Sequence, residues 1–347
     1  DNGDPTDKDV FVRFFAPGGK AVAPSYRANT TLEGDQENPS IATGNTRVLD
    51  SINGNSTSDV VVVWQAKNQG DAGNGIFAQR FQLTSFLNQS NGQGNSSQSN
   101  AVTFSPINSE FRVSSSTEGN QEDPVVAMNE TGNFVVVWAG RGQNDNNLTG
   151  QDDSGFGIFA QRYNANGTPI APGLELDSPT TDPDSPDANP VVPRAVLVNS
   201  TTRGDQEKPA IASDARGNFV VVWQGRSSKG DGEDIYAQLF DRFGNPRGLE
   251  FRVNSETDND QVNPAVAMDR RGNFVIAWED DEQDDDGTGI SARRYSASGN
   301  PNGNVFRVNQ RTDGDQRTPA IGIDKNGSFR LSSISAVCGI LPSRKMF

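Results

Sequence analysis

Short apolar runs, separated by turns rich in glycine, asparagine and aspartate, recur along the chain. The most regular run has the form NFVVVW; it is too short for a helix and rich in β-branched residues, so it predicts a strand. Three further strand-like runs accompany it: PAIAS before it, and IYAQLF and EFRVN after it. The turns DARGN and DRFGNP join them. No segment shows a helical period of 3.6 residues, and we therefore expect an all-β chain.

These four strands form one repeating unit. Residues 207–261 and 262–316 are each 55 residues long and align without a gap. The tripeptide GDQ, or a close variant, ends each unit. All four tryptophans occupy the same repeat position, the end of the NFVVVW strand: Trp64, Trp138, Trp223 and Trp278. Four antiparallel strands in a unit of roughly 50 residues are typical of a propeller blade, so we expect the tryptophans to be buried between neighbouring blades.

Each end of the chain holds half a unit. The N-terminal end has only strands three and four, and the C-terminal end has only strands one and two. We expect the two halves to form one composite blade, which gives a five-bladed β-propeller of four-stranded antiparallel blades. The single propeller domain, 1–347, is then divided into a half-blade 10–36, blades 37–121, 122–206, 207–261 and 262–316, a half-blade 317–336, and an atypical tail 337–347.

The composite motif NPAVAMD, GNFVVVW, IFAQRY, EFRVN and GDQ resembles tandem repeats of large secreted and cell-surface proteins from cyanobacteria and other bacteria. Its opening, a proline followed by an aspartate and a glycine, is also similar to propeller repeats of the NHL type. The resemblance covers residues 10–330. It implies a propeller fold and an extracellular or cell-surface location, and it implies little about activity.

Composition excludes several classes of function. The net charge is −15 with a pI near 4.5, which argues against binding to nucleic acids or to anionic membranes. There is no histidine and only one cysteine, Cys338, so His-based catalysis, His-ligated metals and internal disulfides are excluded. No run of 18 apolar residues could span a membrane. The chain begins at Asp1 instead of methionine, from which we expect a processed N-terminus.

Carboxylate chemistry and binding of hard cations remain. In a meandering blade, the GDQ loops and the acidic loops between strands two and three share one face. Oxygen ligands on loops suit Ca²⁺, which is therefore the expected cofactor. The candidate ligands are Asp35, Asp205, Asp260, Asp315, Asp231, Asp234, Asp284 and Asp286. The alternative is that each GDQ aspartate only closes a turn by accepting hydrogen bonds from the backbone.

Five-bladed propellers include glycosidases with paired carboxylates, but here the acids of the GDQ ring recur and no single Asp/Glu pair stands out. We therefore expect no catalytic residues and no enzyme. The expected function is that of an extracellular structural or adhesive protein, stabilised by Ca²⁺ and able to form filaments through its half-blades. The alternative is a carbohydrate-binding, lectin-like propeller, with a glycosidase as a third possibility. The expected partners are a second copy of the chain or a surface or matrix polysaccharide.

Overall fold

The computed structural model describes residues 7–15, 19–21, 23–50, 55–67, 73–86, 101–117, 119–141, 155–171, 195–202, 204–226, 232–281, 287–310, 313–324 and 327–336. These residues form strands, turns and irregular segments. In this part of the chain there is no helix long and apolar enough to cross a membrane.

The described strands form four large sheets and two small ones. The first sheet consists of β3 (Gln36–Asp50), β4 (Asn55–Ala66), β5 (Gly75–Phe86) and β6 (Ala101–Arg112). The second consists of β7 (Gln121–Met128), β8 (Phe134–Gly140) and β9 (Gly157–Tyr163), with β10 (Pro169–Ile170) and β11 (Val196–Leu197) both paired to β9. The third consists of β12 (Gln206–Ser213), β13 (Phe219–Arg226), β14 (Glu233–Phe240) and β15 (Phe251–Arg252). The fourth consists of β16 (Gln261–Met268), β17 (Phe274–Asp281), β18 (Thr288–Tyr295) and β19 (Phe306–Arg307).

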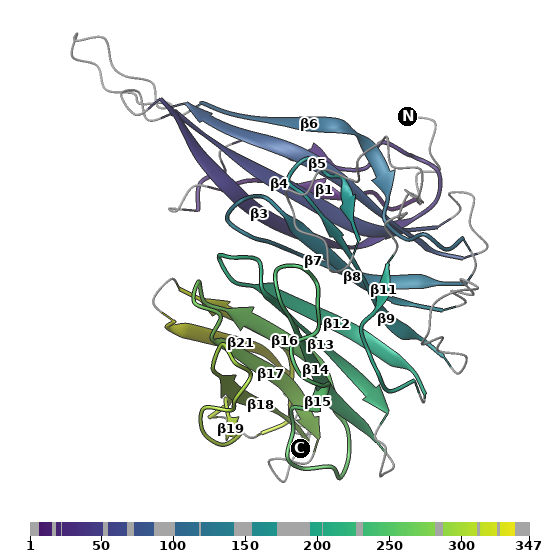
Figure 1. Cartoon of the computed structure of the whole chain (residues 1–347), viewed down its shortest axis with the longest axis vertical. Helices are drawn as coiled ribbons and strands as arrows, with labels where there is room; N and C mark the ends of the chain where they lie inside the picture. The colour runs from purple at the N-terminus through teal and green to yellow at the C-terminus, as the bar shows by residue number, and fades with distance from the viewer. Residues whose placement is uncertain are drawn as a thin grey trace, which may run out of the picture.

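The large sheets are arranged as the blades of a propeller (Figure 1). Within each sheet the strands are antiparallel, and they pair in chain order except for β11, which pairs with β9. The first strands of successive sheets contact one another in sequence, from β3 through β7, β12 and β16 to β20 (Asp315–Ile323). The structure thus confirms the predicted all-β propeller with four-stranded antiparallel blades.

The two half-units form separate small sheets. At the N-terminal end β1 (Phe11–Val12) pairs with β2 (Tyr26–Arg27), and at the C-terminal end β20 pairs with β21 (Phe329–Ala336). β21 departs from the repeat: Arg330 and Ser332 stand where β17 has Val275 and Ala277. The composite blade, and with it the count of five, stays a prediction, as do the domain boundaries.

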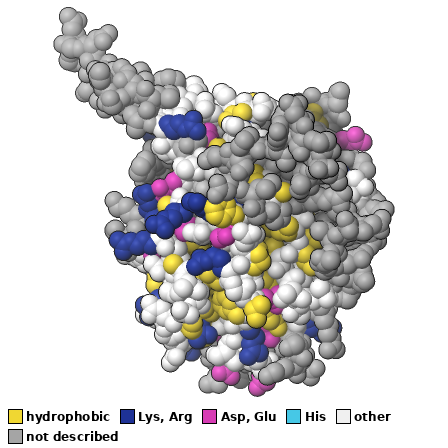
Figure 2. Space-filling model, in the orientation of Figure 1, with side chains coloured by type: hydrophobic (Ala, Val, Ile, Leu, Met, Phe, Trp, Pro, Cys, Tyr) yellow, Lys and Arg dark blue, Asp and Glu magenta, His cyan; other side chains and the backbone are white. Residues whose placement is uncertain are grey.

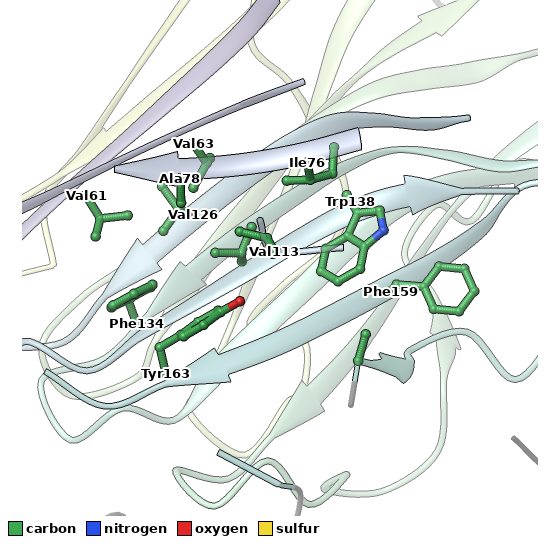
Figure 3. Close-up of a cluster of buried hydrophobic side chains, with 12 residues drawn as sticks. Val61, Val63, Ile76, Ala78, Val113, Val126, Phe134, Trp138, Phe159 and Tyr163 are labelled. Carbon is green, nitrogen blue, oxygen red and sulfur yellow. The ribbon is translucent and has the colours of Figure 1, made fainter. Parts of the chain in front are cut away.

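The tryptophans fill the interfaces between sheets, as predicted. All four are fully buried, with 0% of their surface exposed. Figure 3 shows one interface, where Trp138 and Phe134 of the second sheet lie with Val63 and Ile76 of the first. The Trp138 ring is stacked with that of Phe159, with 6.2 Å between centroids. The prediction that the tryptophans occupy equivalent buried positions is confirmed.

The continuous apolar run of the second strand follows from its position inside a blade. Every residue of β8 is buried. Val136 and Trp138 pack in the interface with the first sheet, whereas Val135 and Val137 pack in the interface with the third. Since successive side chains of a strand point to opposite faces, a strand covered on both faces needs apolar residues at every position.

The surface is not uniform in charge or shape. The first sheet has the longest strands, 12 to 15 residues, and the ends of these strands extend toward the upper left of Figure 1. Although the chain carries a net charge of −15, Figure 2 shows Lys and Arg side chains gathered toward the left of this face. Hydrophobic side chains are visible near its centre.

Candidate functional site

Five first strands bulge at the same repeat position. In the third sheet the register with the neighbouring strand shifts between Glu207 and Ala210, and equivalent shifts occur in β3, β7, β16 and β20. A proline follows the bulged residue each time, which is tolerated because a bulge needs no ladder donor there. The bulged residues have left-handed backbone conformations: Asn38 (φ 49°), Asp123 (52°), Lys208 (50°), Asn263 (51°) and Thr318 (54°).

These bulges surround one cavity of about 460 Å³, which we name the axial cavity. It is lined by the five bulged residues and the prolines that follow them, together with Ser40 and Val125. A left-handed conformation at a residue other than glycine costs on the order of 1–3 kcal/mol, and such strain is concentrated at functional sites. A bulge also changes the direction of a side chain. The repeat thus brings five side chains from different strands around one space.

Bonds from the preceding sheet hold the bulges in place. The N–H of Asp123 donates to Oε1 of Gln65 at 3.1 Å, and the N–H of Asn263 donates to Oε1 of Gln224 at 3.0 Å. The N–H of Thr318 donates to Oε1 of Glu279 at 2.7 Å. Each acceptor directly follows the buried tryptophan of its sheet. The packing of the tryptophans is therefore coupled directly to the geometry of the cavity.

The lining of the axial cavity differs between repeats. Asp123 is the one carboxylate among the described lining residues, and Lys208 is the one cation. Lys208 Nζ lies 2.8 Å from Asp123 Oδ2, and Asn38 Nδ2 donates to Asp123 Oδ1 at 3.2 Å. The ion pair joins the second sheet to the third. Asp123 is thus held in place by a cation and an amide on either side.

Two half-buried glutamates, Glu122 and Glu207, are close enough to this ion pair for its charges to shift their pKa values. A third half-buried glutamate, Glu233, is close enough to Glu207 for the charge of Glu207 to shift its pKa. Burial is the main cause that raises the pKa of Glu122 and that of Glu207. Burial also raises the pKa of Glu233 to about 7, with further increases from the negative charges of Glu207, Asp260 and Asp205 against the opposing charge of Arg226. Glu233 therefore carries a proton about half of the time near neutral pH.

The acids form one electrostatic group. The charge of Glu207 raises the pKa of Glu233, and the charge of Asp123 raises that of Glu207. Acid–base chemistry with two carboxyl groups needs one group that holds its proton near pH 7 and another that stays charged. Asp123 lines the axial cavity, whereas Glu233 lies outside its lining and is linked to Asp123 through the charge of Glu207.

Sequence reasoning overlooked these acids because it examined the recurring GDQ aspartates. The available signal was a departure from the repeat. Position 123 is occupied in the other units by Asn38, Lys208, Asn263 and Thr318. Position 233 is equivalent to Asn74, Phe156 and Thr288, each of whose N–H groups donates to a GDQ Asp or Asn as that of Glu233 does. Both acids are therefore singular in the repeat.

The predicted calcium ligands of the GDQ loops make hydrogen bonds to the backbone. Oδ1 of each accepts the N–H that begins the third strand of the preceding unit. The pairs are Asp35 with Lys8 (3.2 Å), Asp205 with Phe156 (2.9 Å), Asp260 with Glu233 (3.0 Å) and Asp315 with Thr288 (3.2 Å). The bond from Thr288 is the main cause that lowers the pKa of Asp315. Such a contact is what we expect if the GDQ aspartates close turns by accepting backbone hydrogen bonds, the alternative to calcium binding.

The other predicted ligands are separate from this ring. Asp234 is buried, accepts a hydrogen bond from Nδ2 of Asn254 at 2.6 Å, and lies 3.6 Å from Nη1 of Arg252. Asp231, Asp284 and Asp286 lie outside the described residues. No group of three or more acidic, His or Cys side chains is placed to hold a metal in the part of the chain that the structure describes. Calcium binding stays a prediction.

No family model matches the chain, and no curated protein matches its sequence. Among solved structures, it is similar to the complex of the GH93 α-L-arabinofuranosidase of Fusarium graminearum with arabinobiose. That match has a TM-score of 0.50 and 10% identity, and it covers 96% of this chain and 82% of the other. A Penicillium chrysogenum α-L-arabinanase complexed with arabinobiose gives a TM-score of 0.49 and 11% identity, covering 96% of this chain and 86% of the other. The shared fold is the β-propeller.

These comparisons correct two expectations. We expected a structural or adhesive protein that forms filaments, and no enzyme. The solved structure with a TM-score of 0.50 is instead an α-L-arabinofuranosidase, and those expectations are withdrawn. The comparisons support a propeller built from repeats; the resemblance to cyanobacterial surface proteins stays a prediction.

Proposed function

We propose that the chain is a glycoside hydrolase and that the axial cavity is its active site. The observation that carries this proposal is Asp123, the one carboxylate in the described lining of the cavity, which is paired with Lys208. Its charge acts on Glu207, and the charge of Glu207 acts in turn on Glu233, whose pKa is about 7. Glycosidases use two carboxyl groups, one as the acid and the other as the base or nucleophile. The propeller fold shared with an α-L-arabinofuranosidase supports the same conclusion.

The proposed roles follow from the surroundings of each acid. Glu233 protonates the oxygen of the glycosidic bond as the bond to the sugar carbon breaks. Asp123 supplies the second carboxylate, which either activates water or attacks the sugar carbon. Glu207 is a positioning residue, because its charge adds to the effect of burial in raising the pKa of Glu233. Lys208 and Asn38 fix the orientation of Asp123.

The first substrate class to test is an arabinose-containing oligosaccharide, since the neighbour of equal fold was solved with arabinobiose. A cavity of about 460 Å³ lies within the range of pockets that bind small molecules, roughly 300–1,000 Å³. We place the enzyme outside the cell, where its acidic composition and the resemblance of its repeats favour a polysaccharide substrate.

The test uses arabino-oligosaccharides with the unmodified protein and with Asp123→Asn. Asparagine occupies the same bulged position in two other units, at Asn38 and Asn263, so this variant is expected to fold. We expect the unmodified protein to release arabinose or short products and the variant to lose at least a hundredfold in rate. The control is Glu37→Gln. Glu37 occupies the repeat position of Glu122 and Glu207, but it forms an ion pair with Lys8, so its loss should leave the rate unchanged.

The same experiment distinguishes a hydrolase from the alternative function, a protein that only binds carbohydrate. If calorimetry shows that the unmodified protein binds the oligosaccharide while no product forms over days, the chain is a carbohydrate-binding propeller and the hydrolase proposal fails. Hydrolysis that Asp123→Asn leaves unchanged would also contradict the proposed site.

A further inference from the structure

On the face opposite the GDQ loops, an arginine closes the groove between successive sheets. Arg80 of the first sheet donates to the carbonyl oxygens of Ala165 and Asn166, in the turn that joins the third and fourth strands of the second sheet. Arg162 of the second sheet donates in the same way to the carbonyls of Arg242 and Phe243 in the third. Both arginines are buried, with 8% and 7% exposed. The groove beside Arg162 retains a cavity of only about 20 Å³.

The third sheet lacks this arginine. The register of the strands places Leu239 at the position of Arg80 and Arg162, opposite Val220 where those residues face Val61 and Val135. Leucine is too short to reach the next turn's carbonyls, and its Cδ1 packs near Gly299 instead. The groove between the third and fourth sheets consequently holds a cavity of about 380 Å³. We name it the turn-face groove.

Three arginines line the turn-face groove: Arg216, Arg247 and Arg271. All three are exposed, and none of them forms an ion pair with another described residue. The lining carboxylate, Asp214, already accepts the N–H groups of Arg216 and Asn218 and the side-chain amide of Asn218. Positive charge therefore dominates this groove in a chain whose net charge is −15.

The groove also offers acceptors and an apolar wall. Ala297 and Ser298, which line it, are the residues equivalent to Arg242 and Phe243, whose carbonyls take the guanidinium of Arg162. No hydrogen bond to the carbonyl of Ala297 or Ser298 is found within the described ranges. Phe219, Leu239 and Met268 supply the apolar surface. A fitting ligand therefore carries an anionic group, hydrogen-bond donors beside it and an apolar face.

We propose that the turn-face groove binds an acidic saccharide of the uronic acid type. Its carboxylate pairs with the arginines in charge-assisted hydrogen bonds, its hydroxyls donate to the free carbonyls, and its ring packs on the apolar wall. This site is separate from the axial cavity, because the turns and the GDQ loops lie at opposite ends of the first strands. It does not depend on the proposed hydrolase activity.

The test measures binding of trigalacturonate and of neutral galactotriose by isothermal titration calorimetry. We expect the unmodified protein to bind the acidic trisaccharide at least tenfold more tightly than the neutral one. Leu239→Arg should restore the arginine that fills the other grooves and weaken binding of trigalacturonate at least tenfold. Arg271→Gln should weaken binding of trigalacturonate about tenfold, because it removes one hydrogen bond between charged groups.

Two controls make the result specific. Arg270→Gln removes a neighbouring cation that pairs with Glu130 and does not line the groove, so binding should remain unchanged. Arg271→Gln changes an exposed residue and tests the site even if Leu239→Arg fails to fold. Equal binding of the two trisaccharides, no binding of trigalacturonate at millimolar concentration, or unchanged binding by Arg271→Gln would overturn the proposal.

Discussion

The hydrogen-bonded framework of the sheets and the axial cavity are both built from the repeat, but side chains are constant in the framework and vary at the cavity. In the framework, every unit carries equivalent groups. All five glutamines of the GDQ tripeptides are at most 2% exposed. In four units an asparagine, buried in three of them, accepts the N–H of an apolar residue, as Asn254 does from Ile235 at 2.9 Å. These constant positions determine the fold.

At the axial cavity the backbone is repeated and the side chains are not. The five bulged residues share φ angles between 49° and 54°, yet they comprise two asparagines, an aspartate, a lysine and a threonine. All five have the same left-handed backbone conformation, but among the described lining residues only Asp123 supplies a carboxylate. In a repeat protein the shared residues thus indicate structure, and the departures from the repeat indicate the candidate chemistry.

The largest expected effect is that of Glu233→Gln on activity. Removing the general acid should reduce kcat by a factor of roughly 10²–10⁴, because the leaving oxygen no longer receives a proton. The matched framework variant is Asp260→Asn, since Asn120 occupies that position naturally and makes the same contact with Asn74. At a pH below the pKa of Glu233, Asp260→Asn should retain most of the activity, measured by product release. Equal losses in both variants would remove the distinction between the two regions.

The next effect is on stability. Trp138→Ala should lower the free energy of unfolding by about 3–5 kcal/mol, because it leaves a cavity in a fully buried interface. It also leaves Oε1 of Gln121, which accepts the indole N–H at 2.9 Å, without that donor. Urea denaturation followed by circular dichroism measures the change. A loss below about 1 kcal/mol would show that the tryptophan positions do not hold the sheets together.

A smaller effect concerns the pH dependence of stability. The pKa of Glu233 rises from 4.5 to about 7 on folding, so the folded state holds the proton more tightly. This residue's contribution to stability is therefore present below pH 4.5 and is lost as the pH rises toward and past 7. Glu233→Gln should consequently have a higher Tm than the unmodified protein at pH 8 and a similar Tm at pH 4.5. The opposite order at pH 8 would contradict the burial of this acid.

The smallest expected effect is that of calcium. The GDQ aspartates each accept a backbone N–H through Oδ1, which leaves Oδ2 as the oxygen for a cation in most of them. If Ca²⁺ binds the native state, adding it should raise the Tm and EGTA should reverse the rise. An unchanged Tm would show that these aspartates serve only the turns of the framework.

The sequence was sufficient to predict an all-β propeller with four-stranded blades, whereas it did not reveal the candidate site. The tryptophans and the NFVVVW strands predicted buried interfaces because a residue repeated in every unit must satisfy the same packing each time. The axial acids were missed because their significance depends on burial and on neighbouring charges from other sheets, which spacing along the chain does not reveal. The turn-face groove was missed for the same reason: Leu239 is an unremarkable strand residue until its position is compared with that of Arg162.

The pH–rate profile tests the central claim most directly. The claim is that Glu233, although outside the lining of the axial cavity, is the acid that acts with Asp123, with a pKa near 7. With an arabino-oligosaccharide substrate, kcat/KM of the unmodified protein should fall above pH 7 along a limb governed by one group. Asp260→Asn should shift this limb to lower pH, because the charge of Asp260 helps to raise the pKa of Glu233. A profile that is flat from pH 6 to 9, or a limb that Asp260→Asn does not move, would contradict the account.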